Sequence, residues 1–267
     1  MKKIVAILTV LILLFSLAAC KSQVMDGDGM IDELPPCTLN VFAAASMTET
    51  LTELQKIWNT LYEPNIELVF TFDSSGTLKT QIEEGAVCDV FISAAQKQMN
   101  QLDELGLIDA ASRVDLLENK CALVVPEGNP AGITSYEDLG TDKVTKIALG
   151  NSDVPVGQYS EEILTYMSLW DELNAAQKIT FGDNVKTVTK TVSEMGADCG
   201  IVYGTDAAAA GLEVVAYPPE GSHSPIVYPA AILANTEYPE QADRFMVFLQ
   251  TIDAANVFEA AGFTVAE

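Results

Sequence analysis

LNVFAAASMTET, residues 39–50, is the part of the sequence that most constrains the fold of this chain. Its first half is apolar and typical of a buried strand, and apolar residues then recur at helical spacing between 51 and 61. Ser46 lies where the strand gives way to the helix. A helix that begins there offers free backbone N–H groups and the positive end of its dipole beside the serine hydroxyl. The stretch therefore predicts a strand, turn and helix that can bind an anion, although Ser46 or Thr48 can also be a simple helix N-cap.

The same arrangement recurs further along the chain. Residues 66–72 form a second predicted strand, which ends at the turn Asp73-Ser-Ser-Gly-Thr77 before helical spacing restarts. A third strand is predicted over 88–95, again followed by a helical pattern. Alternating strands and helices favour parallel βαβ units. Ligands collect outside the carboxyl ends of such strands, which is where these serine turns must lie.

A second group of strands and helices is predicted after the buried strand at 121–126. Here a loop enters a helix at Val156, a polar pair just before Val185 can cap another helix, and a strand ends at Tyr203. The pattern predicts an α/β fold with two lobes, mainly parallel sheets and helices on both sheet faces. The expected domains are lobe 1, lobe 2 and a return to lobe 1, at residues 37–120, 121–211 and 212–267.

The N-terminus has the features of a lipoprotein signal. Two lysines precede an apolar run that ends in Leu17-Ala-Ala-Cys20. We therefore expect residues 1–19 to be removed as a signal peptide and Cys20 to carry a lipid that anchors the protein, outside the cytoplasm, to the cell membrane. The alternative, a transmembrane helix followed by a free cysteine, needs a longer apolar run. Residues 20–36 would form the lipid anchor and a flexible acidic tether. Part of this segment resembles a calcium-binding loop, but the match is incomplete, so we favour the tether.

Four further cysteines permit disulfides in an exported chain. We favour Cys37 with Cys88, because each stands just before a predicted parallel strand, and hence Cys121 with Cys199. Free buried thiols are the alternative. The spacing of the four cysteines is not that of a zinc site.

An acidic chain can still bind an anion through local dipoles. The formal charge of −24 argues against nucleic-acid binding, but surface carboxylates are screened over about 10 Å at moderate salt. Residues at predicted strand ends and helix starts offer hydroxyl or N–H donors without any cation: Ser46, Ser75, Val156, Val185 and Tyr203. Such a set suits a small, fully ionised tetrahedral oxyanion, which has acceptors on every side and no proton to give. Taken singly, the serines are more often turn residues and the tyrosine a core aromatic.

Several motifs, in the same order, resemble the periplasmic molybdate-binding proteins of ABC transporters. They are Val41-Phe-Ala-Ala-Ala-Ser46, Phe72-Asp-Ser-Ser75-Gly-Thr-Leu78, Asp89-Val-Phe-Ile-Ser-Ala94, Asp153-Val-Pro-Val156-Gly157, Gly200-Ile-Val-Tyr203-Gly-Thr-Asp206 and Gly262-Phe-Thr264. The resemblance covers nearly the whole chain after the tether. It implies a two-lobed type II periplasmic-binding-protein fold, with two crossing strands as hinge and the oxyanion in the cleft between the lobes.

The resemblance also implies a function and a role for each donor. The protein would bind molybdate, and tungstate, and deliver it to an ABC transporter permease with its cytoplasmic ATPase; we expect a monomer with no cofactor and no enzymatic activity. Ser46 and Ser75 look like the serine ligands, each giving hydroxyl and N–H. Val156 and Val185 look like backbone N–H donors, and Tyr203 like the phenol donor.

Two residues depart from the family pattern. Val156 stands where alanine is common, which keeps the N–H donor but can narrow the cleft. Asp73 precedes the serine pair, where a small or neutral residue is often seen. Its carboxylate would repel a dianion and would instead accept a proton from hydrogen phosphate. We expect Asp73 to point away, because adjacent side chains in a strand face opposite sides.

Other functions compete with this interpretation. A binding protein for another tetrahedral oxyanion, sulfate or phosphate, would use the same donors. A secreted serine hydrolase needs a base, yet the only histidine, His223, lies in a turn-like segment, and no Gly-x-Ser-x-Gly elbow is present. A surface lipoprotein with a vestigial cleft would bind no oxyanion at all.

Overall fold

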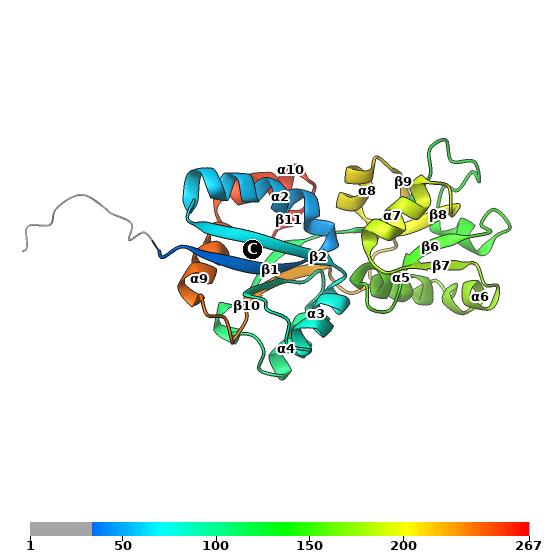
Figure 1. The fold of residues 1–267 in the computed structure, drawn as a ribbon. Coiled ribbons are helices and arrows are strands. Elements are labelled where there is room, and N and C mark those ends of the chain that lie inside the picture. The colour runs from blue at the N-terminus through cyan, green and yellow to red at the C-terminus, as the bar shows by residue number, and fades with distance from the viewer. Residues whose placement is uncertain (1–33, 267) are drawn as a thin grey trace, which may run out of the picture. The chain divides into compact units, whose positions relative to one another are not determined.

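The computed structural model describes residues 34–266, whose fold is shown in Figure 1. The predicted signal peptide, Cys20 and most of the tether lie outside the described residues. Between residues 34 and 266, no helix is long and apolar enough to cross a membrane. The described strands form two sheets, one of six strands and one of five.

The six-stranded sheet contains residues 39–44, which the sequence predicts to form a buried strand. Its strands are β1 Cys37–Ala44, β2 Ile66–Asp73, β3 Val90–Ile92, β4 Val114–Glu118, β10 Val227–Ile232 and β11 Thr264–Val265, in the order β11-β4-β10-β3-β1-β2. β1 pairs in parallel with β2 and β3, as the alternation of strands and helices predicts. β10 pairs antiparallel with β3 and β4, and β11 pairs antiparallel with β4. The sheet is therefore mixed, with its parallel strands grouped at one side.

The five-stranded sheet is mixed in the same way. Its strands are β5 Cys121–Val125, β6 Ile147–Gly150, β7 Ile179–Gly182, β8 Cys199–Tyr203 and β9 Glu213–Ala216, in the order β7-β6-β8-β5-β9. β6 is parallel to β7 and β8, whereas β5 is antiparallel to β8 and β9. The sequence predicts that residue 212 begins the return to lobe 1, but β9 still belongs to this sheet. The chain passes between the sheets after β4 and again after β9; the lobe boundaries themselves stay predictions.

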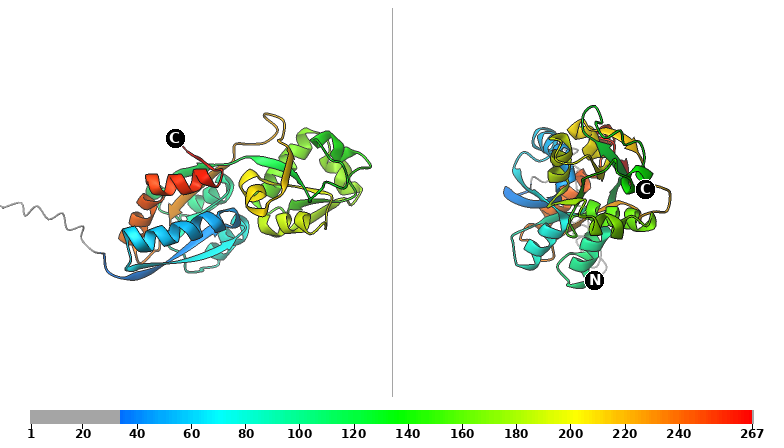
Figure 2. Two further views of the ribbon diagram at one scale, coloured as in Figure 1. Left: turned by 90° about the horizontal axis from the view of Figure 1, so that it is seen from above. Right: turned by 90° about the vertical axis from the view of Figure 1, so that its right-hand side faces the viewer.

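Helices cover both faces of the six-stranded sheet. The α-helices of the described chain are α2 Thr48–Ile57, α3 Ser75–Glu83, α4 Gln96–Glu104, α5 Pro155–Tyr166, α6 Trp170–Ala175, α7 Val185–Ser193, α8 Gly204–Ala210, α9 Pro239–Phe248 and α10 Ile252–Ala260. Short helical turns occur at η1 Ala45–Met47, η2 Trp58–Tyr62, η3 Ala110–Ser112 and η4 Tyr136–Gly140. α2 and α10 lie side by side on one face (Figure 2), and α3 and α4 lie on the other (Figure 1). The apolar stripes of these helices thus bury both faces of the sheet.

Side-chain caps fix where the helices beside the strand ends begin. The Ser74 hydroxyl accepts the N–H of Thr77 at 3.1 Å, so α3 starts at Ser75. The Asn184 side chain accepts the N–H of Thr187 at 3.0 Å, so α7 starts at Val185. Pro155 is the first residue of α5, a position where its missing N–H costs no helical hydrogen bond. The sequence therefore sets helix starts next to the carboxyl ends of β2, β6 and β7.

The favoured disulfides are wrong, because all four cysteines of residues 34–266 are free thiols. Cys121 begins β5 and Cys199 begins β8, but these strands are antiparallel, with Cys121 opposite Tyr203. The two cysteines therefore stand at opposite ends of the pair, about 13 Å apart at the strand rise of 3.3 Å per residue. A disulfide needs Cα atoms less than about 7 Å apart.

The register also separates Cys37 from Cys88. β1 and β3 are parallel as predicted, but Val41 is the partner of Val90. Cys37 therefore lies two residues further down its strand than Cys88 does, which leaves the Cα atoms about 8 Å apart. Cys88 is buried, and its thiol donates to the carbonyl oxygen of Val90 at 3.3 Å.

Candidate functional site

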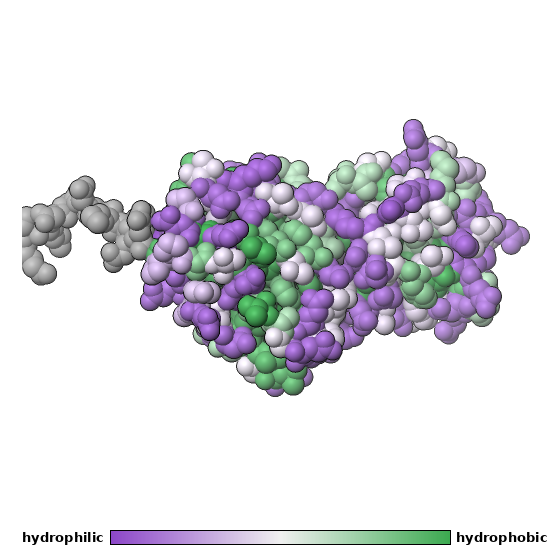
Figure 3. All heavy atoms as spheres, in the orientation of Figure 1, coloured by the Kyte–Doolittle hydropathy of each residue, from purple (hydrophilic) through white to green (hydrophobic). Residues whose placement is uncertain are grey.

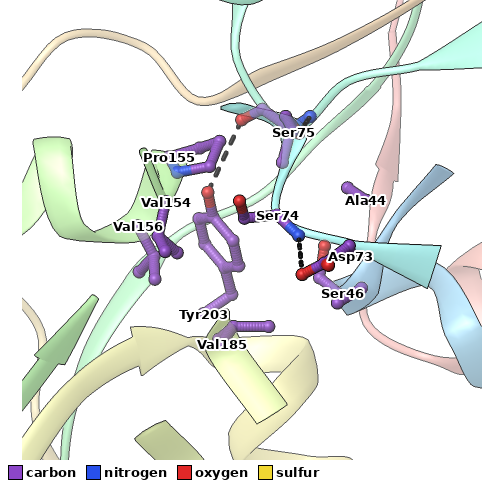
Figure 4. A pocket seen from close by; sticks show the side chains of 12 residues that line it. Ala44, Ser46, Asp73, Ser74, Ser75, Val154, Pro155, Val156, Val185 and Tyr203 are labelled. Atoms are coloured by element: carbon purple, nitrogen blue, oxygen red, sulfur yellow. Dashed lines mark hydrogen bonds between the residues drawn. The ribbon is translucent and has the colours of Figure 1, made fainter. Parts of the chain in front are cut away.

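All five predicted donor residues line one small cavity, which is shown in Figure 4. Its cavity volume is about 10 Å³, close to what one water molecule occupies on the same measure. Pockets for drug-sized ligands have roughly 300–1,000 Å³, so this cavity suits a small ion better than a larger organic solute. The lining comes from both sheets and their helices: Ala44, Ala45, Ser46, Asp73, Ser74, Ser75, Ala94, Val154, Pro155, Val156, Val185 and Tyr203.

Ser46 reaches the cavity from the turn that follows β1. It is the middle residue of η1 and is buried, with 6% of its surface exposed. Its hydroxyl oxygen lies 2.9 Å from the hydroxyl of Tyr228 in β10. The serine is therefore no helix N-cap, since η1 and α2 have no side-chain cap.

Ser75 reaches the same cavity from the start of α3 and is fully buried. Its Oγ accepts the backbone N–H of Ala94 at 2.9 Å. Ala94 follows β3 and Ser75 follows β2, so the ends of two strands that lie on either side of β1 meet at this serine. Because the oxygen already accepts a hydrogen bond, the proton of the Ser75 hydroxyl is left to donate.

Val156 and Val185 bring helix N-termini to the cavity. Val156 is the second residue of α5, and Val185 is the first residue of α7. Neither residue's N–H has an acceptor within its own helix, because the first turn of a helix has no preceding carbonyl groups. Both side chains are buried. These N–H groups and the helix dipoles make this side of the cavity electropositive without a formal charge.

Tyr203 closes the cavity from the end of β8, and 1% of its surface is exposed. Its hydroxyl donates to the carbonyl oxygen of Ala94 over a long 3.5 Å. Burial raises the pKa of Tyr203 well above its usual value. The phenol thus keeps its proton and acts as a donor.

The expectation that Asp73 points away is wrong, because Asp73 lines the cavity. It is the last residue of β2, where the strand ends and strict alternation of side chains no longer holds. One carboxylate oxygen accepts the N–H of Ser74 at 2.7 Å and the side-chain N–H of Asn184 at 3.4 Å. Asp73 therefore links the two sides of the cavity and places a negative charge beside it.

No residue that lines the cavity in the described chain is a lysine, arginine or histidine. Lys186 follows the donor Val185, but its ammonium group lies 2.7 Å from Glu49 of α2 and 3.0 Å from the buried Asp206 of α8. Those two carboxylates neutralise it. Any attraction of the cavity for an anion must therefore come from hydroxyl and N–H dipoles.

Direct contacts join the two sides around the cavity. The N–H of Gly76 in α3 donates to the carbonyl oxygen of Asp153 at 3.0 Å. The Lys186–Glu49 and Asn184–Asp73 pairs run between the same two sides. Elements that flank the two sheets are therefore in contact around the cavity.

His223 does not support a serine hydrolase. Its Nδ1 lies 2.7 Å from the carbonyl oxygen of the neighbouring Ser224, and its ring packs edge-on against Tyr159 at 5.9 Å. It is not among the residues that line the cavity with Ser46 and Ser75. Neither serine thus has a histidine base in this structure.

Sequence reasoning missed the residues that form hydrogen bonds with the hydroxyls of Ser46 and Ser75. Tyr228 and Ala94 both lie in or next to predicted strands, but nothing in their local sequence indicates contact with a serine. Tyr228 is separated from Ser46 by 182 positions. Only the order of strands in the sheet brings the two together.

Comparison with known proteins places the chain in a family. Residues 39–264 match the sequence model of the bacterial extracellular solute-binding proteins. YvgL of Bacillus subtilis, provisionally assigned as an ABC transporter substrate-binding lipoprotein, is 36% identical over 249 residues, which are 92% of each chain. The molybdate-binding protein ModA of Haemophilus influenzae is 36% identical over 231 residues, covering 85% of this chain and 89% of ModA.

A solved structure extends the comparison to the fold. The periplasmic molybdate-binding protein of Azotobacter vinelandii superposes with a TM-score of 0.76 at 26% identity, covering 86% of this chain and all of that one. The two-lobed type II fold is thereby confirmed. The chain belongs to the bacterial extracellular solute-binding protein family, and within it to the relatives of the molybdate-binding proteins of ABC transporters.

Proposed function

We propose that this protein binds molybdate, and tungstate, in the cavity between its lobes and delivers the anion to an ABC importer. One observation carries the proposal: the cavity collects hydroxyl and N–H donors from both lobes and no cationic side chain. A tetrahedral dianion has acceptor oxygens on every side, so it can use all of these donors at once. The relatives named as molybdate-binding proteins support the choice of ligand.

The donor set is sufficient for tight binding. A hydrogen bond to a charged group contributes about 1.5–3 kcal/mol, so five of them outweigh the cost of ordering and desolvating one small ion. Neutral donors cannot distinguish molybdate from sulfate by charge. The size of the cavity, narrowed by Val156, would make that distinction.

Binding and transport are coupled through lobe closure. An anion that contacts both lobes binds the closed state more tightly than the open state. This difference in binding free energy sets how far the anion shifts the equilibrium toward the closed state. The permease would then recognise the closed, loaded form. In this proposal lobe 1 is residues 37–120 with the 212–267 return, lobe 2 is residues 121–211, and lipidation of Cys20 keeps the monomeric protein next to the permease.

Calorimetric titration of the full chain in detergent tests this function. We expect molybdate and tungstate to bind one to one, with sulfate and phosphate at least a hundredfold weaker. Ser46→Ala and Ser75→Ala should each weaken molybdate binding about ten- to a hundredfold, the equivalent of one charge-assisted hydrogen bond. Ser193→Ala, which changes an exposed serine of α7, is the matched control and should bind normally.

The titration can also refute the proposal. Equal affinity for sulfate would remove the claim of selectivity. Absence of binding by every oxyanion would contradict the function itself and favour a vestigial cleft.

A further inference from the structure

A series of hydrogen-bonding side chains, buried except for the half-buried Asn119, leads from Ser46 away from the cavity. The Ser46 hydroxyl lies 2.9 Å from that of Tyr228, and the Tyr228 hydroxyl lies 3.3 Å from Nδ2 of Asn119. The same Nδ2 lies 2.9 Å from the hydroxyl of Thr205 in α8. Tyr228 is fully buried, and Asn119 lies in the link between β4 and β5 where the chain passes between the sheets. The cavity is therefore connected to the crossing point of the lobes.

Asn119 fixes which group donates in each of these hydrogen bonds. Its Oδ1 lies 2.8 Å from the backbone nitrogen of Lys120. A backbone N–H can only donate, so the amide oxygen must face it and the amide nitrogen must face Tyr228 and Thr205. Asn119 therefore donates a hydrogen bond to the Tyr228 hydroxyl.

Tyr228 must then pass a hydrogen bond on to Ser46. Burial raises the pKa of Tyr228 well above its usual value, so the phenol keeps its proton. Within the described residues, its hydroxyl has only Ser46 as a partner besides Asn119. A buried proton without an acceptor costs about 1–3 kcal/mol. The arrangement in which Tyr228 donates to Ser46 avoids this cost.

The Ser46 hydroxyl is left with one use for its own proton. Its oxygen accepts from Tyr228, so the proton is free to point into the cavity. Ser75 is arranged in the same way, because its oxygen accepts the N–H of Ala94. Each serine oxygen thus accepts a hydrogen bond from a protein group, and each hydroxyl proton is available to a ligand in the cavity.

We propose that Tyr228 and Asn119 are positioning residues that preset Ser46 as a donor, and that Ser46 thereby disfavours anions that carry a proton. The acceptor that Asp73 adds to the cavity is the same in every variant compared below. This inference rests on the proposed function, since it concerns the same cavity. Sulfate and hydrogen phosphate are the informative pair of ligands. Both are tetrahedral dianions of similar size, but hydrogen phosphate must donate one hydrogen bond and sulfate donates none.

Asn119→Asp reverses the direction of the hydrogen bonds that run from residue 119 through Tyr228 to Ser46, while the side chain keeps nearly the same shape. The introduced carboxylate can only accept, so Tyr228 would donate to it, and Ser46 would donate to Tyr228 and present its lone pairs to the cavity. The added negative charge weakens both dianions equally. We therefore expect the ratio of the hydrogen phosphate Kd to the sulfate Kd, measured at pH 8 by competition with molybdate on the full chain, to fall at least tenfold.

Two further variants complete the test. Tyr228→Phe frees the Ser46 hydroxyl to rotate, so we expect the ratio to fall by less than in Asn119→Asp and molybdate to bind several-fold more weakly. Thr205→Val removes the other acceptor of Asn119 but leaves Tyr228 in place, and should keep the wild-type ratio. Thermal melts establish that each variant is folded, and Tyr228→Phe decides the question if Asn119→Asp does not fold.

The outcomes separate this inference from the proposed function. An unchanged ratio in the folded variants, with molybdate still bound by the wild-type protein, overturns the role of Tyr228 and Asn119 alone. A wild-type protein that binds no oxyanion overturns both proposals. A lowered ratio in Asn119→Asp and Tyr228→Phe, with Thr205→Val unchanged, supports both.

Discussion

Gly76 brings the backbones on the two sides of the cavity into direct contact. Its N–H donates to the carbonyl oxygen of Asp153 on the opposite side, and a Cβ at Gly76 would lie 2.3 Å from that oxygen. Gly76→Ala therefore forces the lobes apart at this contact. Overpacking costs about 1–3 kcal/mol, so we expect molybdate affinity to fall about tenfold or more, although no ligand donor is changed.

Gly204→Ala is the matched control for the substitution at Gly76. The added Cβ would meet only the carbonyl oxygen of Lys120 at 3.8 Å, which is ordinary contact. Titration with molybdate should give the wild-type Kd for this control. An unchanged Kd in Gly76→Ala would show that ligand binding does not require the contact with Asp153.

Asp73 is the one carboxylate among the lining residues, and it opposes an anionic ligand. Asp73→Asn keeps an oxygen that can accept from Ser74 and Asn184 but removes the charge. We expect molybdate to bind about tenfold more tightly, with the gain decreasing as salt screens the charge. Asp171→Asn in the first turn of α6 is the control for a distant charge. Weaker binding in Asp73→Asn would mean that the carboxylate helps to hold the ligand.

At residue scale, the sequence predicts the donor residues better than it predicts the residues that contact them. Ser46, Ser75, Val156, Val185 and Tyr203 each end a strand or begin a helix, and local pattern reveals such positions. The contact of Tyr228 with Ser46 and the position of Asp73 depend on how strands align across the sheet. Residues far apart in sequence make those contacts, so no local pattern encodes them.

At the scale of elements, α7 and α8 meet through a buried ion pair. Lys186 of α7 contacts Asp206 of α8, whose side chain is fully buried. Burial raises the pKa of Asp206 to about 6 from an ordinary 3.8, against the opposing effect of Lys186. The folded protein therefore holds a proton that the unfolded chain has lost between these two pH values.

This proton makes stability fall as pH rises. Because the folded state binds more protons than the unfolded state in that window, the contribution of Asp206 to the free energy of unfolding should decrease by about 2 kcal/mol from pH 4 to pH 7. Asp206→Asn removes the titration. Urea unfolding at several pH values should show the wild-type protein losing stability relative to Asp206→Asn, whereas parallel pH profiles would refute the assignment.

The existence of the elements is more predictable than their direction. Period-two and helical patterns indicate most of the strands and helices, including those that bear the site. They do not reveal that β5 runs antiparallel to β8, which is why the Cys121–Cys199 disulfide is predicted wrongly. β4 and β11 are short and carry no strong alternation, so sequence reasoning omits them.

At the scale of the whole molecule, an acidic protein is proposed to bind a dianion. Figure 3 shows hydrophilic side chains over much of the visible face, around a hydrophobic patch. The formal charge of the chain is −24. Surface charges of this kind are screened over about 10 Å at moderate salt, whereas dipoles at the cavity wall act on the ligand at contact distance. The short-range donors therefore dominate once the ligand is desolvated.

In the proposed complex, neutral dipoles from both lobes hold the anion. A crystal structure with bound molybdate, in which anomalous scattering locates the metal, would show the groups that contact it. We predict one molybdate whose oxygens contact the hydroxyls of Ser46, Ser75 and Tyr203 and the N–H groups of Val156 and Val185. A molybdate held by lysine or arginine, or one remote from both serine turns, would contradict the account.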